Sequence, residues 1–226
     1  MPPDTPPVAP RRRWALWAVL AVLWAGAVTA GLATLAAYDN AAGTAASAPP
    51  RWPVPSRLAL DRDRPTLVML AHPRCSCTQA SVGELAELMA RAPKRPKAYV
   101  VFVKPGRAGA STAWERTDLW DRAAGIPDVT VVGDDDRHEA GLFGAETSGQ
   151  TFLYAPDGAL LFSGGTTGAR GHAGDNAGRA TLLALLRHEI ASRRTTPVFG
   201  CSLFAAGDRA PDAHAHEPAH AHPDAN

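Results

Sequence analysis

The sequence has no concentration of charge of one sign. Its 226 residues include 23 lysines and arginines and 22 aspartates and glutamates, which are interspersed and give a formal net charge of +1. There is no basic stripe with interleaved aromatic residues, so nothing predicts binding to nucleic acid. The phosphate-binding pattern GxxxxGK[ST] is also missing, and the glycine-rich stretch at residues 164–176 does not by itself predict a phosphate site.

Cysteine is scarce, with only three residues in the chain: Cys75, Cys77 and Cys201. An odd number leaves at least one thiol free after any internal disulfide has formed. Disulfides persist in oxidising compartments. The cysteine content therefore fits a domain that lies outside the cytoplasm and carries at least one thiol.

The longest apolar run lies near the N-terminus. No residue from Trp14 to Ala37 is charged, and the run exceeds the roughly 20 residues that a helix needs to cross the hydrocarbon core. Arg11 to Arg13 come directly before it, which favours a cytoplasmic segment at 1–13 and an external location for the rest. We therefore predict a transmembrane helix over 14–37. A cleaved signal peptide is the alternative, although Ala-Ser-Ala at 46–48 lies far beyond the run.

Two segments beyond this run resemble linkers in composition. Residues 38–57 are rich in Ala, Gly, Ser and Pro, which predicts a flexible linker. Residues 195–226 form a C-terminal extension, and its end is expected to be disordered. Four of the eight histidines lie in that tail: His214, His216, His220 and His222. Alternating histidines in a flexible tail can bind Cu²⁺, Ni²⁺ or Zn²⁺ weakly.

Between residues 58 and 194 two kinds of apolar pattern alternate, which predicts an α/β domain. Short continuous apolar runs predict buried strands at 66–71, 98–103 and 129–132. Helical spacing predicts helices over 78–92 and 177–192, the second with Leu182, Leu186 and Ile190 on one apolar stripe. Thr112 and Glu115 form a capping-box pattern that predicts a helix over 112–124, and a short helix is expected over 137–143. Strands at 151–154 and 159–163 flank an Ala-Pro-Asp-Gly turn, which predicts a hairpin.

This order of elements, with a cysteine pair after the first strand and at the mouth of the first helix, resembles the thioredoxin fold, a central mixed sheet flanked by helices. FLYAPDGALLFSGG is similar to the hairpin of that family. HPRCSCTQASVGEL and LFSGGTTGARGHAGDNAG resemble the RedB-type, membrane-anchored thioredoxin-like proteins of bacteria. The resemblance covers residues 60–194. It implies a bacterial inner-membrane protein with a periplasmic domain, whose partner is a thiol or disulfide of another protein.

Two features depart from the thioredoxin pattern. Thioredoxins carry Cys-x-x-Cys, whereas this chain has Cys75-Ser76-Cys77. They also carry a cis-proline before the hairpin, and Gly149 takes approximately its place here. Both departures argue against a general thioredoxin activity.

Cys75 and Cys77 are the candidate catalytic residues, because thiol exchange needs an accessible thiolate. The start of a helix stabilises a thiolate, and Arg74 or a protonated His72 would assist it. Residues two apart on a helix face different ways, so we expect Cys75 in the loop and Cys77 at the cap or in the first turn. A disulfide across one residue departs from relaxed geometry. We therefore predict a readily exchanged couple, with Cys75 attacking and Cys77 resolving.

The role of Cys201 stays open at this point. It can act as a second resolving thiol, pair with another chain, or remain a lone thiol. His172 in the glycine-rich loop is a further accessory candidate, and Asp175 or Asn176 can cap the last helix.

Two other functions compete with thiol–disulfide exchange. Cys75 and Cys77, together with Cys201 or with His72, His138 or His172, can bind copper or zinc, which would suit a copper-handling protein. A non-catalytic redox sensor is the third possibility. No cofactor other than a weakly bound metal is expected.

Overall fold

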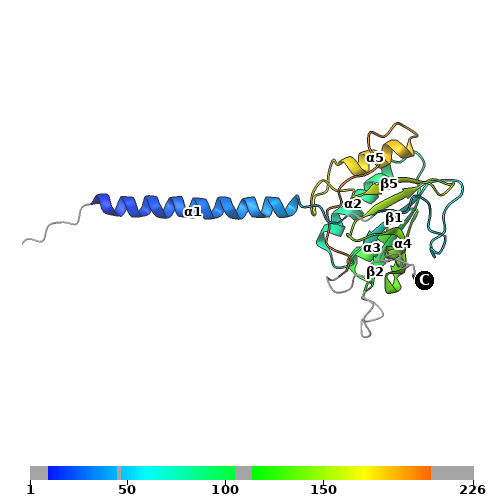
Figure 1. The fold of residues 1–226 in the computed structure, drawn as a ribbon, viewed down its shortest axis with the longest axis horizontal. Helices are drawn as coiled ribbons and strands as arrows, with labels where there is room; N and C mark the ends of the chain where they lie inside the picture. Colours follow the sequence, from blue (N-terminus) through cyan, green and yellow to red (C-terminus); the bar gives the residue numbers. More distant parts are fainter. Residues whose placement is uncertain (1–9, 45–46, 105–113, 205–226) are drawn as a thin grey trace, which may run out of the picture.

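The computed structural model describes residues 10–44, 47–104 and 114–204. Helix α1 (Pro10–Asp39) projects from the rest of the protein as a single rod (Figure 1). Within its section Arg13–Asp39, an 18-residue window has a mean hydropathy of 2.0, and none of that window is buried. This helix is therefore long and apolar enough to cross a membrane, a property that a signal sequence shares.

The folded part is built on a five-stranded mixed sheet in the order β3-β2-β1-β4-β5. Its strands are β1 (Thr66–Ala71), β2 (Lys97–Val103), β3 (Val129–Asp134), β4 (Thr151–Tyr154) and β5 (Leu160–Gly164). β1, β2 and β3 are parallel, whereas β4 is antiparallel to both β1 and β5. β1 is the central strand and all of its residues are buried, as its continuous apolar sequence predicted.

Two different layers cover the two faces of the sheet. Helices α2 (Ser76–Arg91), α3 (Asp118–Ala124) and α5 (Ala177–Leu186) pack on one face, where Leu85, Trp120 and Leu182 meet the strands. Helix α4 (His138–Phe143) covers part of the other face, after a short 3-10 turn, Asp135–Arg137. Chain segments without regular structure complete that layer, through Trp52 and Leu203 among others.

The predicted elements are present, but two helices have different limits. The helix expected over 112–124 begins at Asp118 within the described residues. Thr112 lies outside the described residues, and Glu115 pairs with Lys104 at 3.1 Å. The helix expected to reach residue 192 ends at Leu186. His188 adopts a left-handed conformation with φ of 60°, and Ile190, assigned to the apolar stripe, is fully exposed.

Residues 38–57 differ from the flexible linker that their composition suggested. Tyr154 donates a hydrogen bond to the carbonyl of Pro49 at 3.0 Å, and the amide of Trp52 donates to Gly158 at 2.8 Å. The ring of Trp52 packs edge-on against Tyr154 at 5.3 Å. The described part of this segment is therefore a strap bound to the domain.

The first part of the C-terminal extension is also packed. Val198 and Leu203 are buried, and Ser202 forms a β-bridge with Thr147. The folded unit thus continues to residue 204, beyond the expected boundary at 194. The disordered tail was predicted for residues outside the described part of the chain.

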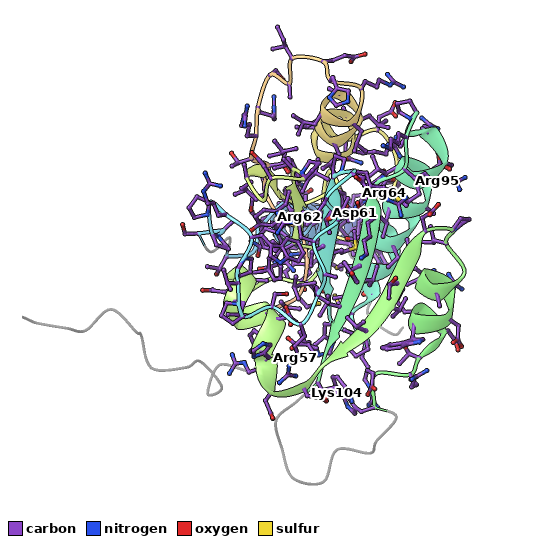
Figure 2. All side chains as sticks on the ribbon, turned by 90° about the vertical axis from the view of Figure 1, so that its right-hand side faces the viewer. Arg57, Asp61, Arg62, Arg64, Arg95 and Lys104 are labelled. Atoms are coloured by element: carbon purple, nitrogen blue, oxygen red, sulfur yellow. The ribbon has the colours of Figure 1, made fainter. Side chains whose placement is uncertain are left out.

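Half-buried to exposed ion pairs join the loops that precede the three parallel strands. Arg64 pairs with Asp61 at 3.0 Å, and both are labelled in Figure 2. Arg64 also pairs with Asp128 at 3.5 Å, and Arg95 pairs with Asp128 at 3.3 Å. Exposed pairs contribute little to stability one by one. The cysteines lie at the opposite end, where the parallel strands finish.

Candidate functional site

Cys75 lies where the central strand passes into a helix. It is the N-cap residue of α2, with an extended backbone and no side-chain capping hydrogen bond. Its amide donates to the carbonyl of His72 at 3.2 Å, and its carbonyl accepts from the amide of Thr78 at 3.1 Å. Cys77 follows in the first turn. These positions are the ones expected for the two residues.

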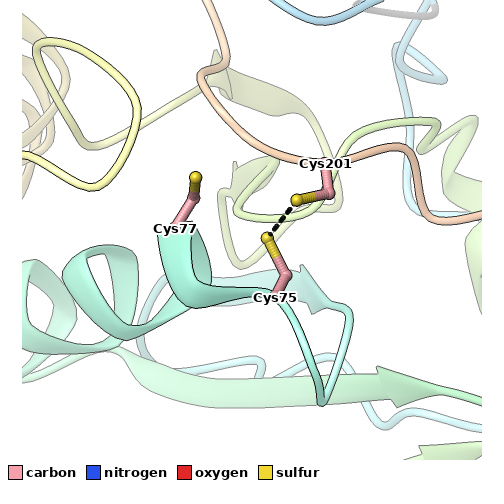
Figure 3. A group of neighbouring side chains, drawn as sticks. All are labelled: Cys75, Cys77 and Cys201. Atoms are coloured by element: carbon pink, nitrogen blue, oxygen red, sulfur yellow. Dashed lines mark hydrogen bonds between the residues drawn. The ribbon is translucent and has the colours of Figure 1, made fainter. Parts of the chain in front are cut away.

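Cys201 joins the pair from the far end of the chain. Its Sγ lies 2.7 Å from the Sγ of Cys75, and all three sulfurs lie within 4.8 Å of one another (Figure 3). All three residues are free thiols. Cys201 thus approaches Cys75 to hydrogen-bond distance, and the expected resolving thiol, Cys77, lies within 4.8 Å of both.

A buried hydrogen-bond network holds Cys201 against the start of α2. The amide of Ser148 donates to the carbonyl of Cys201 at 2.9 Å. The Ser148 hydroxyl accepts from the amide of His72 at 2.8 Å and shares a hydrogen bond with the hydroxyl of Thr78. This close approach requires glycine at position 200, because a Cβ there would lie 2.0 Å from the Ser148 carbonyl oxygen. Sequence reasoning missed Thr78, Ser148 and Gly200, because only the folded chain brings them together.

Gly149 lies at the position compared with the cis-proline of thioredoxins. Its φ is +89°, and a Cβ would lie 2.6 Å from the Oγ of Ser81. Its amide donates to the carbonyl of Leu70 at 2.8 Å, a bond that proline cannot make. The described peptide bonds include no cis bond. This departure from the thioredoxin pattern therefore has a local structural reason.

The three thiols differ in their tendency to ionise. Burial opposes ionisation of Cys75, but hydrogen bonds from Cys201 and Thr78 outweigh it and hold the pKa of Cys75 below its ordinary value of 9.0. Burial raises the pKa of Cys77, and the charge of Cys75 raises it further. Burial, with the hydrogen bond to Cys75, raises the pKa of Cys201 to about 12. The cluster thus favours a single thiolate, on Cys75.

His72 and Arg74 lie beside the thiols but interact mainly with Trp114. The His72 ring stands edge-on to Trp114 at 5.4 Å, and the Arg74 guanidinium lies 5.1 Å from its centre. The amide of Arg74 donates to Nδ1 of His72 at 3.2 Å. Burial and the charge of Arg74 lower the pKa of His72. These contacts favour a neutral His72, which differs from the protonated helper considered above.

The other histidine candidates lie elsewhere. Nδ1 of His172 lies 2.9 Å from the Arg170 carbonyl oxygen, and Nε2 of His138 lies 3.2 Å from that of Pro55. Neither belongs to the group of three metal-ligating side chains found among the described residues. The four tail histidines, His214, His216, His220 and His222, are outside the described residues.

The glycine-rich loop folds back onto α2. Buried Glu84 of α2 pairs with buried Arg179 and accepts hydrogen bonds from the amide of Gly174 at 2.7 Å and the side chain of Asn176 at 2.8 Å. Asn176 also caps α5 by accepting from the amide of Arg179 at 2.8 Å, as its sequence position predicted. The loop is therefore fixed by a buried, fully hydrogen-bonded carboxylate.

An open depression of about 560 Å³ lies beside Cys75, between the starts of α2 and α3. Its lining residues are Pro73, Arg74, Cys75, Ser76, Gln79, Thr117, Asp118, Leu119 and Arg122. It gives the otherwise buried Cys75 an approach from solvent, past both arginines and one carboxylate.

Three features decide the architecture. The chain runs strand–helix–strand and then through a hairpin to a final helix, the core strands have the order β2-β1-β4-β5, and a cysteine follows β1. The fold is thioredoxin-like. Strand β3 extends this thioredoxin-like core beside β2. Both the expected α/β class and the expected fold are confirmed.

Comparisons with known proteins find similar chains among solved structures. No protein-family model and no curated protein matches the chain. A hypothetical protein from Sinorhizobium meliloti 1021 is 21% identical, with a TM-score of 0.54, over 74% of this chain and 96% of its own. An uncharacterized conserved protein from Geobacillus kaustophilus is 17% identical, with a TM-score of 0.55, over 75% of this chain and 95% of its own.

A third similar structure is the pneumococcal exposed lipoprotein thioredoxin from Streptococcus pneumoniae strain TIGR4. It is 16% identical, with a TM-score of 0.40, over 56% of this chain and 86% of its own. At these identities the likeness concerns the fold alone.

Proposed function

We propose that this chain is a membrane-anchored thiol–disulfide oxidoreductase of the RedB-type thioredoxin-like group, with Cys75 as attacking thiol and Cys201 as resolving thiol. The observation that carries the proposal is the 2.7 Å approach of the Cys201 sulfur to the Cys75 sulfur at the start of α2. Cys75 has the lowered pKa that a nucleophilic thiol needs. Cys201 is already within reach of it, which supports Cys201 in place of Cys77 as the resolving thiol.

The exchange proceeds in two balanced steps. The Cys75 thiolate attacks one sulfur of the partner's disulfide, which breaks that S–S bond, forms a mixed disulfide and releases the partner's first thiolate. Cys201 transfers its proton to the released thiolate and attacks the Cys75 sulfur. The Cys75–Cys201 disulfide forms, and the partner's second thiolate leaves. Two electrons thereby pass to the partner, and the same steps in reverse oxidise a dithiol.

The mixed disulfide also prepares Cys201 for the second step. The negative charge of Cys75 and its hydrogen bond contribute to the raised pKa of Cys201. Both contributions vanish once Cys75 is bonded to the partner. The pKa of Cys201 then falls, and its thiolate becomes accessible when it is needed.

Helix α1 supplies the membrane attachment in this proposal. Its length and apolar composition suit a retained anchor, and Arg11 to Arg13 favour a cytoplasmic N-terminus. The domain would then lie on the periplasmic side of the bacterial inner membrane, where its partner is a protein thiol or disulfide reached through the depression beside Cys75.

The test compares two trapping variants, Cys201→Ser and Cys77→Ser. With a disulfide-bonded model substrate, Cys201→Ser is expected to accumulate a mixed disulfide on Cys75, because resolution is removed. Cys77→Ser should keep turning over and accumulate little. Peptide mass analysis identifies the bonded cysteine. Accumulation in Cys77→Ser alone would instead assign the resolving role to Cys77.

The sulfur cluster favours a second candidate function, the carriage of Cu(I). Three thiol sulfurs within 4.8 Å of one another are a soft ligand set of the kind that selects Cu(I). Competition with a chromophoric Cu(I) chelator tests this: serine at any of the three positions should weaken binding strongly. Unchanged Cu(I) affinity in the Cys77→Ser variant would contradict a three-thiolate site.

A further inference from the structure

Arg170 of the glycine-rich loop connects the end of α1 to the cysteine centre. Its amide donates to the carbonyl of Asp39 at 2.9 Å, and its Nε donates to the carbonyl of Ala41 at 3.2 Å. The guanidinium lies 4.9 Å from the centre of the Tyr38 ring. The same guanidinium donates to the carbonyl of Gly200, the residue before Cys201. One side chain thus contacts both the last turn of the apolar helix and the segment that carries the resolving thiol.

The chain after α1 repeats this connection independently of Arg170. The amide of Gly43 donates to the carbonyl of Val198 at 2.8 Å. The Thr147 hydroxyl donates to the carbonyl of Thr44 at 2.8 Å, and Thr147 is bridged to Ser202. Residues 38–44 therefore run against the segment 198–202. The domain is attached to its anchor at the cysteine centre, with little free chain between them.

Arg170 itself is held in place by the loop around it. Buried Glu84 fixes the C-terminal part of that loop through Gly174, Asn176 and Arg179. Loss of these partners would leave the Glu84 carboxylate buried and unpaired, which would strongly destabilise the folded protein. The glycine-rich loop, residues 164–176, therefore acts as a rigid bracket. This structural role accounts for a loop that takes part in no step of the proposed exchange.

We infer that the three thiols are held close to the membrane surface and exchange with a membrane protein whose cysteine lies directly beside its own transmembrane segment. This inference rests on the proposed function and on α1 as a retained anchor. In Figure 1, α1 leaves the domain on the side where α2 lies. A partner thiol held far above the bilayer surface would be out of reach of a cysteine centre that is fixed next to the membrane end of the domain.

Reconstitution of the full chain in liposomes tests this placement. The protein carries Cys77→Ser and Cys201→Ser, so that Cys75 is the only thiol. Two synthetic single-span peptides each carry one cysteine, activated as a mixed disulfide with a coloured thiol. In the first the cysteine directly follows the span, and in the second a helical spacer of about 20 residues raises it by about 30 Å. Attack by Cys75 joins the peptide and releases the coloured thiolate, whose absorbance gives the rate.

We expect the first peptide to react at least about tenfold faster than the second, through its higher effective concentration. Insertion of about 18 Gly/Ser residues between Ala37 and Tyr38 keeps the Arg170 contacts and adds a flexible reach of about 24 Å, so it should remove the preference. Arg170→Ala should reduce the preference, whereas Arg193→Ala, at an exposed site, should leave it unchanged. Equal rates for both peptides in the parent protein would overturn the inference.

A water-soluble activated disulfide separates this inference from the exchange function. If it reacts with Cys75 while the peptides show no preference, the placement is wrong and exchange stands. If it does not react, exchange fails, and a fluorophore on Cys77 of a Cys75→Ser, Cys201→Ser protein still tests the placement. Lipids with nitroxide groups at the bilayer surface should quench this fluorophore strongly, and the insertion should relieve the quenching. Weak quenching in both proteins would overturn the placement.

Discussion

Helices α2 and α5 begin in opposite ways, although both pack on the same face of the sheet. Asn176 caps α5 by accepting a hydrogen bond from the amide of Arg179, the usual arrangement at a helix start. Cys75 occupies the equivalent position of α2, and its side chain makes no such bond. The capped start of α5 stabilises the fold. The uncapped start of α2 leaves its free amides and the helix dipole available to stabilise a thiolate.

Replacing Cys75 by Ser should produce the largest effect, because it removes the thiolate from the uncapped start. Exchange with a disulfide substrate should fall below detection, since a hydroxyl at this position has no comparable nucleophilicity. The thiolate absorbance in the ultraviolet that Cys75 contributes below pH 9.0 should also disappear. Asn176→Ala is the matched change at the capped start and should retain exchange. Residual activity in Cys75→Ser would show that another thiol attacks.

Replacing Glu84 by Ala should cause the largest loss of stability, because it removes the buried partner of Arg179 and leaves only the exposed carboxylate of Asp175, at 3.1 Å. Breaking a buried ion pair costs about 3–5 kcal/mol, which denaturant unfolding can measure. Glu87→Ala in the same helix removes only an exposed pair with Arg91, for which about 0.3–0.5 kcal/mol is expected. Similar losses in both variants would contradict the bracket role of Glu84.

Asn176→Ala tests the capped start directly. Loss of an N-cap side chain costs about 1 kcal/mol, and here the hydrogen bond to Glu84 is lost as well. The free energy of unfolding should therefore fall by about 1–2 kcal/mol. Asn176→Asp is the control that keeps the cap but places a second carboxylate beside Glu84. If Asn176→Asp proves more stable than Asn176→Ala, the cap dominates over this repulsion.

The pH dependence of Cys75 should show the smallest of these effects. Because its pKa lies below 9.0, alkylation of Cys75 should reach half its maximal rate below pH 9.0. Ionised Cys75 also favours the folded state, and this contribution is lost as pH falls through the folded pKa. Thr78→Val removes a hydroxyl hydrogen bond to the thiolate and should move the midpoint upward. An unchanged midpoint would assign the lowered pKa to Cys201 and to the backbone amide of Thr78.

The parts of the structure that follow from local patterns were predictable from the sequence. The apolar run of β1, the helix after it and the positions of Cys75 and Cys77 all depend on neighbouring residues. The contact between Cys75 and Cys201 joins residues 126 positions apart, and no local pattern encodes it. The identity of the resolving thiol therefore required the fold.

Composition was a poor guide to the two segments that flank the domain. Residues 38–57 and 195–204 contain few apolar side chains in a regular pattern, so they were predicted as linker and extension. Their attachment depends on backbone hydrogen bonds to distant partners, such as Gly43 with Val198. Such bonds leave almost no trace in the sequence, because any residue except proline can make them.

The packing of residues 198–204 decides how this protein can be divided in the laboratory. A fragment cut at the expected limits, residues 58 and 194, would contain Cys75 and Cys77 but lack Cys201. It would also lack Val198 and Leu203, which are buried at 1% and 4% exposure. Such a fragment would report the chemistry of an incomplete centre. The smallest faithful unit of the folded part therefore runs from the strap to residue 204.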